Sequence, residues 1–506
     1  MSEGAELVIG IVGAIGTDLA SVSESLQRHL TGVGYSASEI RVSHLLHDID
    51  AYSALAELHD RERYYDEHMN AGNNLCERIK RADAMALLAI LQLRTSRQER
   101  NTELKVEPTT PLPRQAFIIN SLKRQEEIKL LKEVYGDAFV LLGAYASRST
   151  RLDTLAERVA KSQNKEAGQC RHIAERLITR DESESTDFGQ DVSHTFFRAD
   201  AFIDATEKPR ADDSIRRFVQ VVFGHPFETP TRDELGMQHA FSSALRSADL
   251  SRQVGAAICS EDGQLICVGT NEVPKAGGGL YWAGERDYRD FRFAETDEPN
   301  AEMKRVILAD LLGRLHDEKL LRRDLDINDL TIEMISGRLK GSRLMSITEF
   351  GRAVHAEMAA ITDAARRGVS VEGAKLFCTT FPCHNCAKHI VAAGIREVVY
   401  IEPYPKSQVA KLFPDSIALD RRPGEGQVSF SSFVGFAPTR FADFFQMRDR
   451  VGDDKHILNW EAVRGSAQPR VSGIPAAYLT EEVTRIEQLK EQLDSANLKF
   501  KKGGEA

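Results

Sequence analysis

The sequence predicts an α/β protein with two domains: an N-terminal parallel-sheet domain, and a C-terminal α/β/α sandwich followed by a tail. The chain has 506 residues, which is longer than a domain with a single hydrophobic core usually is. Hydrophobic residues make up 42% and charged residues 28%, the balance of a globular protein. Short apolar runs alternate with amphipathic segments, which indicates strands alternating with helices.

The N-terminal domain is expected over residues 1–205. Its first apolar run, LVIGIVG (7–13), ends in glycine, as a buried parallel strand would, and leucines at helical spacing follow it. A strand is then expected at 116–122, a helix at 124–136 and a strand at 137–147. The polar, proline-containing stretch at 205–214 is predicted to be a linker.

The second domain is expected over residues 215–450. It starts with a helix at 231–248 and two adjacent strands at 253–260 and 264–271. A long insertion over about 272–350 follows, and connections of this length usually carry function or cover a site. Regular alternation then resumes with a helix, a strand, a helix and a strand at 355–368, 374–380, 383–394 and 396–403.

The polar tail, 451–506, is predicted to contain an exposed or partner-packed helix at 481–500. The net charge of −10 weighs against a polynucleotide as the main substrate. No apolar run approaches the roughly 18 residues that a membrane helix needs, so no membrane partner is expected. The start of the chain lacks a charged leader, and seven thinly spread cysteines do not form a disulfide framework, which together favour a cytoplasmic location.

The strongest chemical signal combines His355 with Cys383 and Cys386. The two cysteines are three residues apart at the start of a predicted helix, so both point from one face of its first turn. A helix N-terminus favours thiolate, the form that binds metal. Two thiolates and one imidazole suit Zn²⁺, and three protein ligands leave the open position of a catalytic site.

Glu357 follows His355 by two residues, about 200° around a helix, and is therefore poorly placed as a second ligand from that segment. At the wall of the pocket it can take a proton from water and return it to a leaving group. Zinc would lower the pKa of a bound water to roughly 7. These residues predict metal-assisted hydrolysis with Glu357 as the catalytic acid and base.

Two other interpretations of the cysteine pair are a structural zinc knuckle and a redox pair. A knuckle would need a second pair of ligands at similar spacing, which the sequence lacks. A redox pair gives no reason for His355 and Glu357. His384 and His389 are rival ligands, expected to be wall or core residues.

Residues 250–410 resemble the cytidine and deoxycytidylate deaminase superfamily. The H-x-E and P-C-x-x-C pattern is the zinc deaminase signature. Further similar segments are SRQVGAAI (251–258), GTNEVPKAGG (269–278) and VVYIEPYPKS (398–407), while Glu272 and the insertion depart from the family. The resemblance implies a cytidine-deaminase-like α/β/α sandwich, Zn²⁺ held by His355, Cys383 and Cys386, and a cytosine nucleotide as substrate.

The substrate-side candidates are Asn271, Arg252, Tyr404 and Lys406. The resemblance implies that Asn271 binds the nucleotide sugar, and its alternative is to close a turn. Tyr404 and Lys406 suit contacts to sugar or phosphate, and the charge of Arg252 suits a phosphate. For these three, a plain surface role is an equal alternative.

A glycine-rich loop follows the first predicted strand and opens a helix, a context in which backbone N–H groups can hold phosphate. Its candidate binding residues are Gly10, Gly13, Gly16 and Thr17. Thr17 stands where a P-loop has lysine. The domain resembles P-loop nucleotide kinases, and this departure predicts a degenerate nucleotide-binding domain; a purely structural loop is the alternative.

A kinase-like front joined to a deaminase-like back resembles the bacterial antiphage dCTP/dCMP deaminases, over about residues 1–450. The resemblance implies depletion of the dCTP pool as antiphage defence, and a homo-oligomer. A nucleotide or a small RNA is the expected regulator. The alternatives are a nucleic-acid-editing cytosine deaminase, a nucleotide-sensing regulator with a dormant deaminase site, and an active nucleotide kinase.

Overall fold

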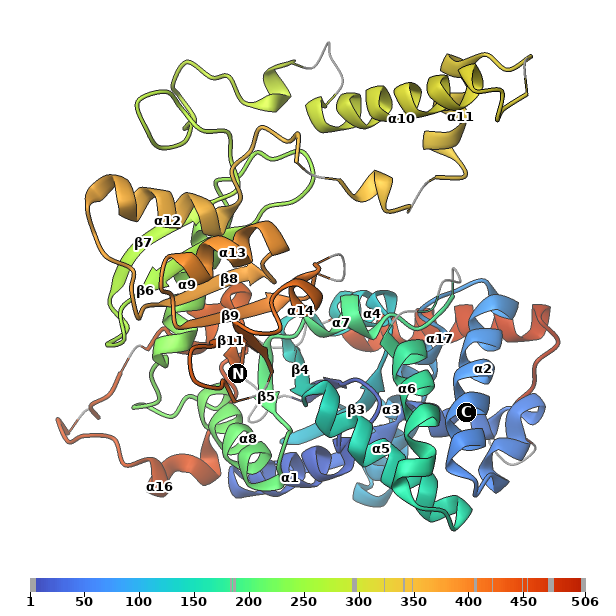
Figure 1. The fold of residues 1–506 in the computed structure, drawn as a ribbon. Coiled ribbons are helices and arrows are strands. Elements are labelled where there is room, and N and C mark those ends of the chain that lie inside the picture. Colours follow the sequence, from blue (N-terminus) through green and yellow to red (C-terminus); the bar gives the residue numbers. More distant parts are fainter. Residues whose placement is uncertain are drawn as a thin grey trace. The chain divides into compact units, whose positions relative to one another are not determined.

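A computed structural model describes most of the chain, and it divides into two compact units (Figure 1). The first unit comprises Met1–Glu234 with Phe433–Ala506, and the second Leu235–Ser432. Both contain a sheet covered by helices, so the predicted α/β class is confirmed. The described residues are 6–182, 184, 188–293, 298–322, 324–339, 342–347, 349–404, 407–420, 422–447, 449–452, 454–471 and 477–501.

The first unit is built on a six-stranded sheet in the order β12-β5-β4-β1-β3-β2. The first five strands in sequence pair in parallel, and β12 adds an antiparallel edge beside β5. The buried apolar run lies at the centre as β1, because both of its faces are covered by helices. The strands are β1 (Leu7–Val12), β2 (Ser36–Arg41), β3 (Gln115–Leu122), β4 (Phe139–Tyr145), β5 (Ala201–Asp204) and β12 (Gly435–Phe436).

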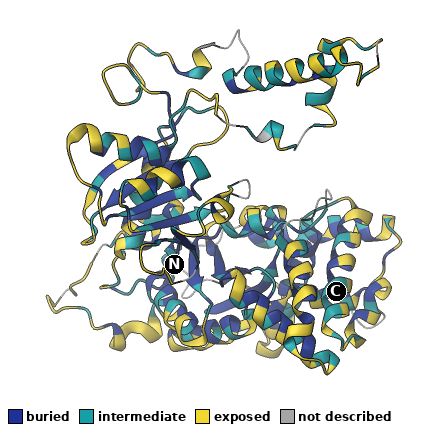
Figure 2. Ribbon diagram, viewed as in Figure 1, coloured by how far each residue is buried: buried dark blue, intermediate teal, exposed yellow. Residues whose placement is uncertain are grey.

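The helices of the first unit cover this sheet and bury its apolar faces, as Figure 2 shows. α1 (Leu19–Gly32) buries Val22, Leu26 and Leu30, one apolar stripe at helical spacing. The other helices are α2 (Arg61–Ile79), α3 (Ala84–Leu104), α4 (Gln125–Tyr135), α5 (Arg148–Gln163), α6 (Ala167–Glu182), α7 (Val192–Phe196), α8 (Lys208–Val222), α15 (Phe441–Phe445), α16 (Trp460–Val463) and α17 (Tyr478–Ser495).

The linker predicted at 205–214 is wrong, because α8 begins at Lys208. Pro209 lies in the first turn of α8, where a proline costs no hydrogen bond. Further along, α8 buries Ile215, Phe218 and Val222 in the core of the first unit. The segment is therefore helical because these apolar residues pack into the core, although the residues before them are polar.

The helix of the tail was expected to be exposed or packed on a partner, but α17 belongs to the first unit and packs against α3. Its Glu482 forms a buried ion pair with Arg97, at 2.6 Å between Oε2 and Nη1. Arg97 also pairs with Glu6 at 2.8 Å. Tyr135 and Tyr478 donate hydrogen bonds to Glu482 and Glu6, so the carboxylates are well satisfied.

We expect Glu482→Ala to lower the free energy of unfolding of the first unit by about 3–5 kcal/mol, because it leaves Arg97 buried with half of its compensation. Urea unfolding followed by circular dichroism measures this change. The matched control is Glu487→Ala, an exposed position on the same helix. Equal unfolding midpoints for the two variants would show that the buried network contributes nothing.

The second unit also has a six-stranded sheet, in the order β10-β11-β9-β8-β6-β7. β6 pairs antiparallel with both β7 and β8, and the remaining neighbours are parallel. The strands are β6 (Gly255–Cys259), β7 (Leu265–Thr270), β8 (Lys375–Thr380), β9 (Glu397–Glu402), β10 (Ile417–Leu419) and β11 (Val428–Ser432).

Helices cover both faces of this sheet. A Cβ on Gly255 would lie 1.9 Å from the carbonyl oxygen of Ala240 in α9 (Arg232–Ala244), and one on Gly269 would lie 2.0 Å from that of Ala356 in α12 (Ala356–Arg367). α13 (His384–Ala392) packs in the same core as α12. The sheet thus lies between α9 and the α12–α13 pair, which confirms the α/β/α sandwich.

The insertion contains α10 (Pro299–Asp317) and α11 (Ile327–Ser336), and α14 (Val409–Leu412) follows β9. The middle of the insertion is therefore helical. Among the described residues, no helix is both long enough and apolar enough to cross a membrane.

Candidate active site

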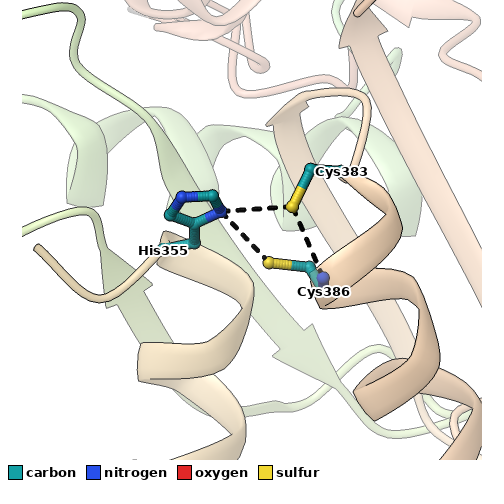
Figure 3. Close-up of side chains that lie close together, drawn as sticks. All are labelled: His355, Cys383 and Cys386. Atoms are coloured by element: carbon teal, nitrogen blue, oxygen red, sulfur yellow. Dashed lines mark hydrogen bonds between the residues drawn. The ribbon is translucent and has the colours of Figure 1, made fainter. Parts of the chain in front are cut away.

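Two helix N-termini bring the candidate metal ligands together (Figure 3). His355 is the N-cap of α12, and Cys383 is the N-cap of α13. Cys386, in the first turn of α13, donates its backbone N–H to the Cys383 sulfur at 3.4 Å. The three-residue spacing therefore places both sulfurs on one side of the helix start, as predicted.

The three ligand atoms lie close to one another. His355 Nδ1 is 3.3 Å from Cys383 Sγ and 3.4 Å from Cys386 Sγ. With zinc bonds of about 2.0 Å to nitrogen and about 2.3 Å to sulfur, tetrahedral ligand atoms lie about 3.5 Å apart. Among the described residues, a search of His, Cys, Asp and Glu side chains finds His355, Cys383 and Cys386 as the group whose ligand atoms are close enough to share an ion. The donor set and its spacing fit Zn²⁺.

The three ligand side chains shift one another's pKa values. A hydrogen bond from Cys386, helped by one with His355, lowers the pKa of Cys383 to about 4. The hydrogen bond with Cys383 raises the pKa of His355 to about 9. The hydrogen bond with Cys383, together with burial, raises the pKa of Cys386 well above its ordinary value. The shift at Cys383 favours the thiolate that binds metal, whereas a cation would have to release the protons of His355 and Cys386.

Glu357 lies in the first turn of α12 and is 4% exposed. Burial raises the pKa of its carboxyl, because a charged carboxylate loses solvation there. A carboxyl whose pKa is raised toward neutrality can both accept and return a proton. His355 was expected to be a helical residue, but it is the N-cap of α12. Glu357 lies at the wall of a cavity, as expected.

A cavity of about 540 Å³ opens beside the cluster, within the size range of small-molecule sites. His355, Cys383 and Glu357 all line it. The fourth side of the ligand cluster can therefore be reached by a small molecule. The insertion contributes part of the wall, namely Asp290, Glu298, Asn300, Lys304 and Met345.

Asn271, Arg252 and Tyr404 line this cavity too, whereas Lys406 lies outside the described residues. The Asn271 side chain accepts a hydrogen bond from Val254 N at 2.7 Å and donates one to Arg252 O at 2.8 Å. It therefore closes the backbone beside the cavity, and its second amide hydrogen remains for another acceptor. Arg252 pairs with Glu402 at 3.2 Å and lies over the Tyr404 ring.

The rival histidines lie elsewhere. His384 is half-buried and His389 is exposed, and neither lines the cavity, so His389 is neither the wall residue nor the core residue expected. Neither belongs to the ligand cluster found in the described part of the chain.

Sequence reasoning missed Asn300, Lys304 and Arg352 as wall residues. Asn300 is 8% exposed and donates to Ile347 O, and Arg352 pairs with Asp290 at 2.7 Å. The only available signal was the length and charge of the insertion, which does not single out residues.

The glycine-rich loop of the first unit follows β1 and precedes α1, as expected. Gly10 lies inside β1, where a Cβ would approach Leu122 and Phe139 to 2.8 Å. It therefore serves sheet packing. Gly13, Gly16 and Thr17 line a separate cavity of that unit.

The part of the chain that contains this site is similar to a known protein family. Residues 230–402 match the family described as the cytidine and deoxycytidylate deaminase zinc-binding region. The matched segment contains His355, Cys383, Cys386 and Glu357.

Several known proteins are similar to this part of the chain. A deoxycytidylate deaminase of Enterobacteria phage T2 is 49% identical over 55 residues, 11% of this chain and 29% of the phage protein. The deoxycytidylate deaminase of Homo sapiens is 25% identical over 168 residues, 33% of this chain and 63% of the human protein. The matches thus span less than two thirds of either relative.

Among solved structures, the dCMP deaminase of cyanophage S-TIM5 in complex with dCMP and dUMP is 18% identical. The match covers 41% of this chain and 99% of the phage chain, with a TM-score of 0.23.

Proposed function

We propose that the second unit catalyses hydrolytic deamination of a free deoxycytidine nucleotide, dCTP or dCMP, to the deoxyuridine nucleotide and ammonia. One observation carries this proposal: His355, Cys383 and the buried Glu357 line one cavity, and Cys386 completes the ligand cluster with His355 and Cys383. That combination is what metal-assisted attack of water on cytosine requires. The family match of residues 230–402 and the names of the relatives support it.

His355, Cys383 and Cys386 would hold Zn²⁺, which supplies a Lewis acid that activates water for attack on C4 of the cytosine ring. Glu357 takes one proton from the attacking water and passes it to N3. It then takes the proton of the hydroxyl group now bonded to C4 and passes it to the departing amino group. One water is consumed, the C4–N4 bond breaks, and ammonia leaves. Burial raises the pKa of Glu357, which favours the return of a proton to the leaving group.

The wall of the cavity also carries groups that suit the rest of the nucleotide. Arg252, Lys304 and Arg352 line the cavity and supply positive charge for phosphate. Arg252 and Arg352 are already paired with carboxylates, which a phosphate would have to replace. Asn271 has one amide hydrogen for a sugar hydroxyl. The net charge of −10 favours a free nucleotide over a polynucleotide.

The biological role is proposed from the resemblance of the whole chain to the antiphage deaminases. In that role the protein acts in the cytoplasm as a homo-oligomer and depletes the dCTP pool. Its activity is restrained by a regulatory nucleotide or a small RNA.

The test is ammonia release by the purified, zinc-loaded protein, with dCTP, dCMP, CTP and oligo-dC as substrates. We expect turnover of dCTP or dCMP and at least about 100-fold less turnover of oligo-dC, because a cavity of about 540 Å³ suits a small ligand and the net charge of −10 disfavours a polynucleotide. Preferential turnover of oligo-dC would favour nucleic-acid editing. Absence of turnover with every substrate would favour the regulator with a dormant site.

A further inference from the structure

Glu272 is a buried carboxylate beside the cavity of the second unit, although it does not line that cavity. It is 1% exposed and immediately follows Asn271, which does line the cavity. A carboxylate loses its hydration when it is buried, so a stable position requires partners that replace the water. The proposed proton transfers make no use of Glu272.

Both oxygens of the Glu272 carboxylate accept hydrogen bonds from the backbone. Oε2 accepts from Ala248 N at 2.9 Å, and Oε1 accepts from Val273 N at 2.9 Å. Ala248 immediately precedes residues 249–252, all four of which line the cavity. The carboxylate therefore fixes the start of a loop that ends at Arg252, one of the residues proposed to meet the phosphate.

The insertion is attached to the same carboxylate by an ion pair. Arg289 Nη1 lies 3.5 Å from Glu272 Oε2, and Arg289 is 8% exposed. The same guanidinium donates from Nη2 to Asp287 Oδ2 at 2.7 Å. The next residue along the chain, Asp290, lines the cavity and pairs with Arg352 at 2.7 Å. Arg352 is a second residue proposed to meet the phosphate.

This ion pair matters because the segment between β7 and α10 has little other support. Its described residues form no strand and one four-residue 3₁₀ helix, Asp290–Phe293. Few backbone hydrogen bonds therefore hold the segment, and contacts of its side chains decide where it lies. Loss of the Glu272 carboxylate would loosen this segment and the loop 249–252 together.

The backbone of Glu272 makes a separate contact, with the segment that carries a metal ligand. Val354 N donates to Glu272 O at 3.0 Å, and Glu272 N donates to Val354 O at 3.3 Å. Val354 immediately precedes His355. These two hydrogen bonds do not involve the side chain of Glu272. Its side chain and its backbone therefore support different parts of the site.

We propose that the Glu272 side chain is a positioning residue for the phosphate side of the cavity. It holds the loop that ends at Arg252 and the insertion segment that carries Asp290, which keeps Arg352 at the cavity wall. This inference rests on the proposed deamination, and it names the residue that makes the site favour a nucleotide over a nucleoside. Loss of the carboxylate weakens the contacts to phosphate, while zinc and Glu357 remain in place.

The test compares the kinetics of ammonia release by zinc-loaded Glu272→Gln and by the unchanged protein. Glutamine has the same shape, but it offers one oxygen to two backbone N–H groups and no charge to Arg289. We expect kcat/KM for dCTP or dCMP to fall about 10- to 100-fold, mainly through KM, because the arginines no longer meet the phosphate in a fixed position. For deoxycytidine, which has no phosphate, we expect a fall of less than about threefold. Equal falls for nucleotide and nucleoside, or a fall in kcat alone, would overturn the proposal.

Hydrogen exchange gives a readout that does not depend on turnover. We expect faster exchange in Glu272→Gln over residues 245–254 and 286–292, and unchanged exchange over residues 353–358, where the backbone contact persists. If the unchanged protein released no ammonia from any nucleotide, the proposed deamination would fail, and exchange would still decide the role of Glu272. Faster exchange over both segments would support that role, and unchanged exchange would overturn it.

The matched control is Glu285→Gln. Glu285 belongs to the same insertion and pairs with Lys275 at 2.6 Å, but it is exposed and does not line the cavity. This variant should leave the kinetics and the exchange unchanged. Effects equal to those of Glu272→Gln would mean that loss of any negative charge from the insertion suffices, which contradicts the proposal.

A second variant, Arg289→Gln, removes the insertion's side of the ion pair and leaves both backbone hydrogen bonds of Glu272 in place. We expect faster exchange over residues 286–292 only, and a smaller rise in KM than in Glu272→Gln. In the double variant, the losses in kcat/KM, expressed as free energies, should be less than additive, because the two side chains act through one ion pair. Additive losses would mean that they act independently and would count against the proposal.

Discussion

Replacing Glu357 by glutamine is expected to lower kcat for dCTP or dCMP deamination by about 10²–10⁴-fold, the range contributed by a positioned general acid and base. The glutamine keeps the shape of the side chain but cannot take up or return a proton. Glu357 is not a member of the ligand cluster, so zinc content should not change. Ammonia release and metal analysis of the same preparation measure both effects.

The control for this substitution is Glu397→Gln. Glu397 lies on β9 of the same sheet, where it pairs with Lys375 at 3.1 Å and is absent from the cavity wall. Its variant should retain full activity. A zinc-loaded Glu357→Gln protein with unchanged kcat would remove Glu357 from the mechanism.

Replacing Cys386 by alanine should abolish zinc binding and activity together. The unchanged protein should bind about one zinc per chain, whereas the variant retains two of three ligands and should lose zinc on dialysis. Cys386 is 1% exposed, and alanine at this position removes a sulfur that lies 3.4 Å from His355 Nδ1. Metal analysis after dialysis, followed by ammonia release, provides the measurement.

Cys259→Ala is the matched control, because Cys259 is a 2% exposed thiol on β6 that lies outside the ligand cluster. It should keep its zinc and its activity. If Cys386→Ala retained zinc after dialysis, another residue would have to serve as the third ligand.

The metal centre was predictable from the sequence because its chemistry depends on local spacing. Cys383 and Cys386 share the first turn of one helix, and a three-residue spacing fixes their relative direction whatever else the chain does. His355 and Glu357 are likewise close in sequence at the start of α12. That the two helix starts meet did not follow from spacing; the resemblance to zinc deaminases supplied it.

The boundaries of the first unit could not be predicted from local spacing in the sequence. β12 and α17 return to it after the whole second unit, and the Arg97–Glu482 pair joins residues 385 apart. In the sequence, the α17 segment is polar, and no residue close to Glu482 along the chain indicates that its carboxylate is buried. Burial of a charge depends on a counter-charge that only the folded chain brings near.

The sequence by itself determined the α/β class, the position of the strands and helices around the metal ligands, and the donor set that fits zinc. The tertiary structure alone decided which residues of the insertion line the cavity, and that Asp181, 166 residues from Ile15, holds the glycine-rich loop. The physical reason is the separation along the chain between the residues that interact. Helix starts, turns and ligand spacings are set by interactions within a few residues, whereas cavities and buried ion pairs arise where distant segments exclude water together.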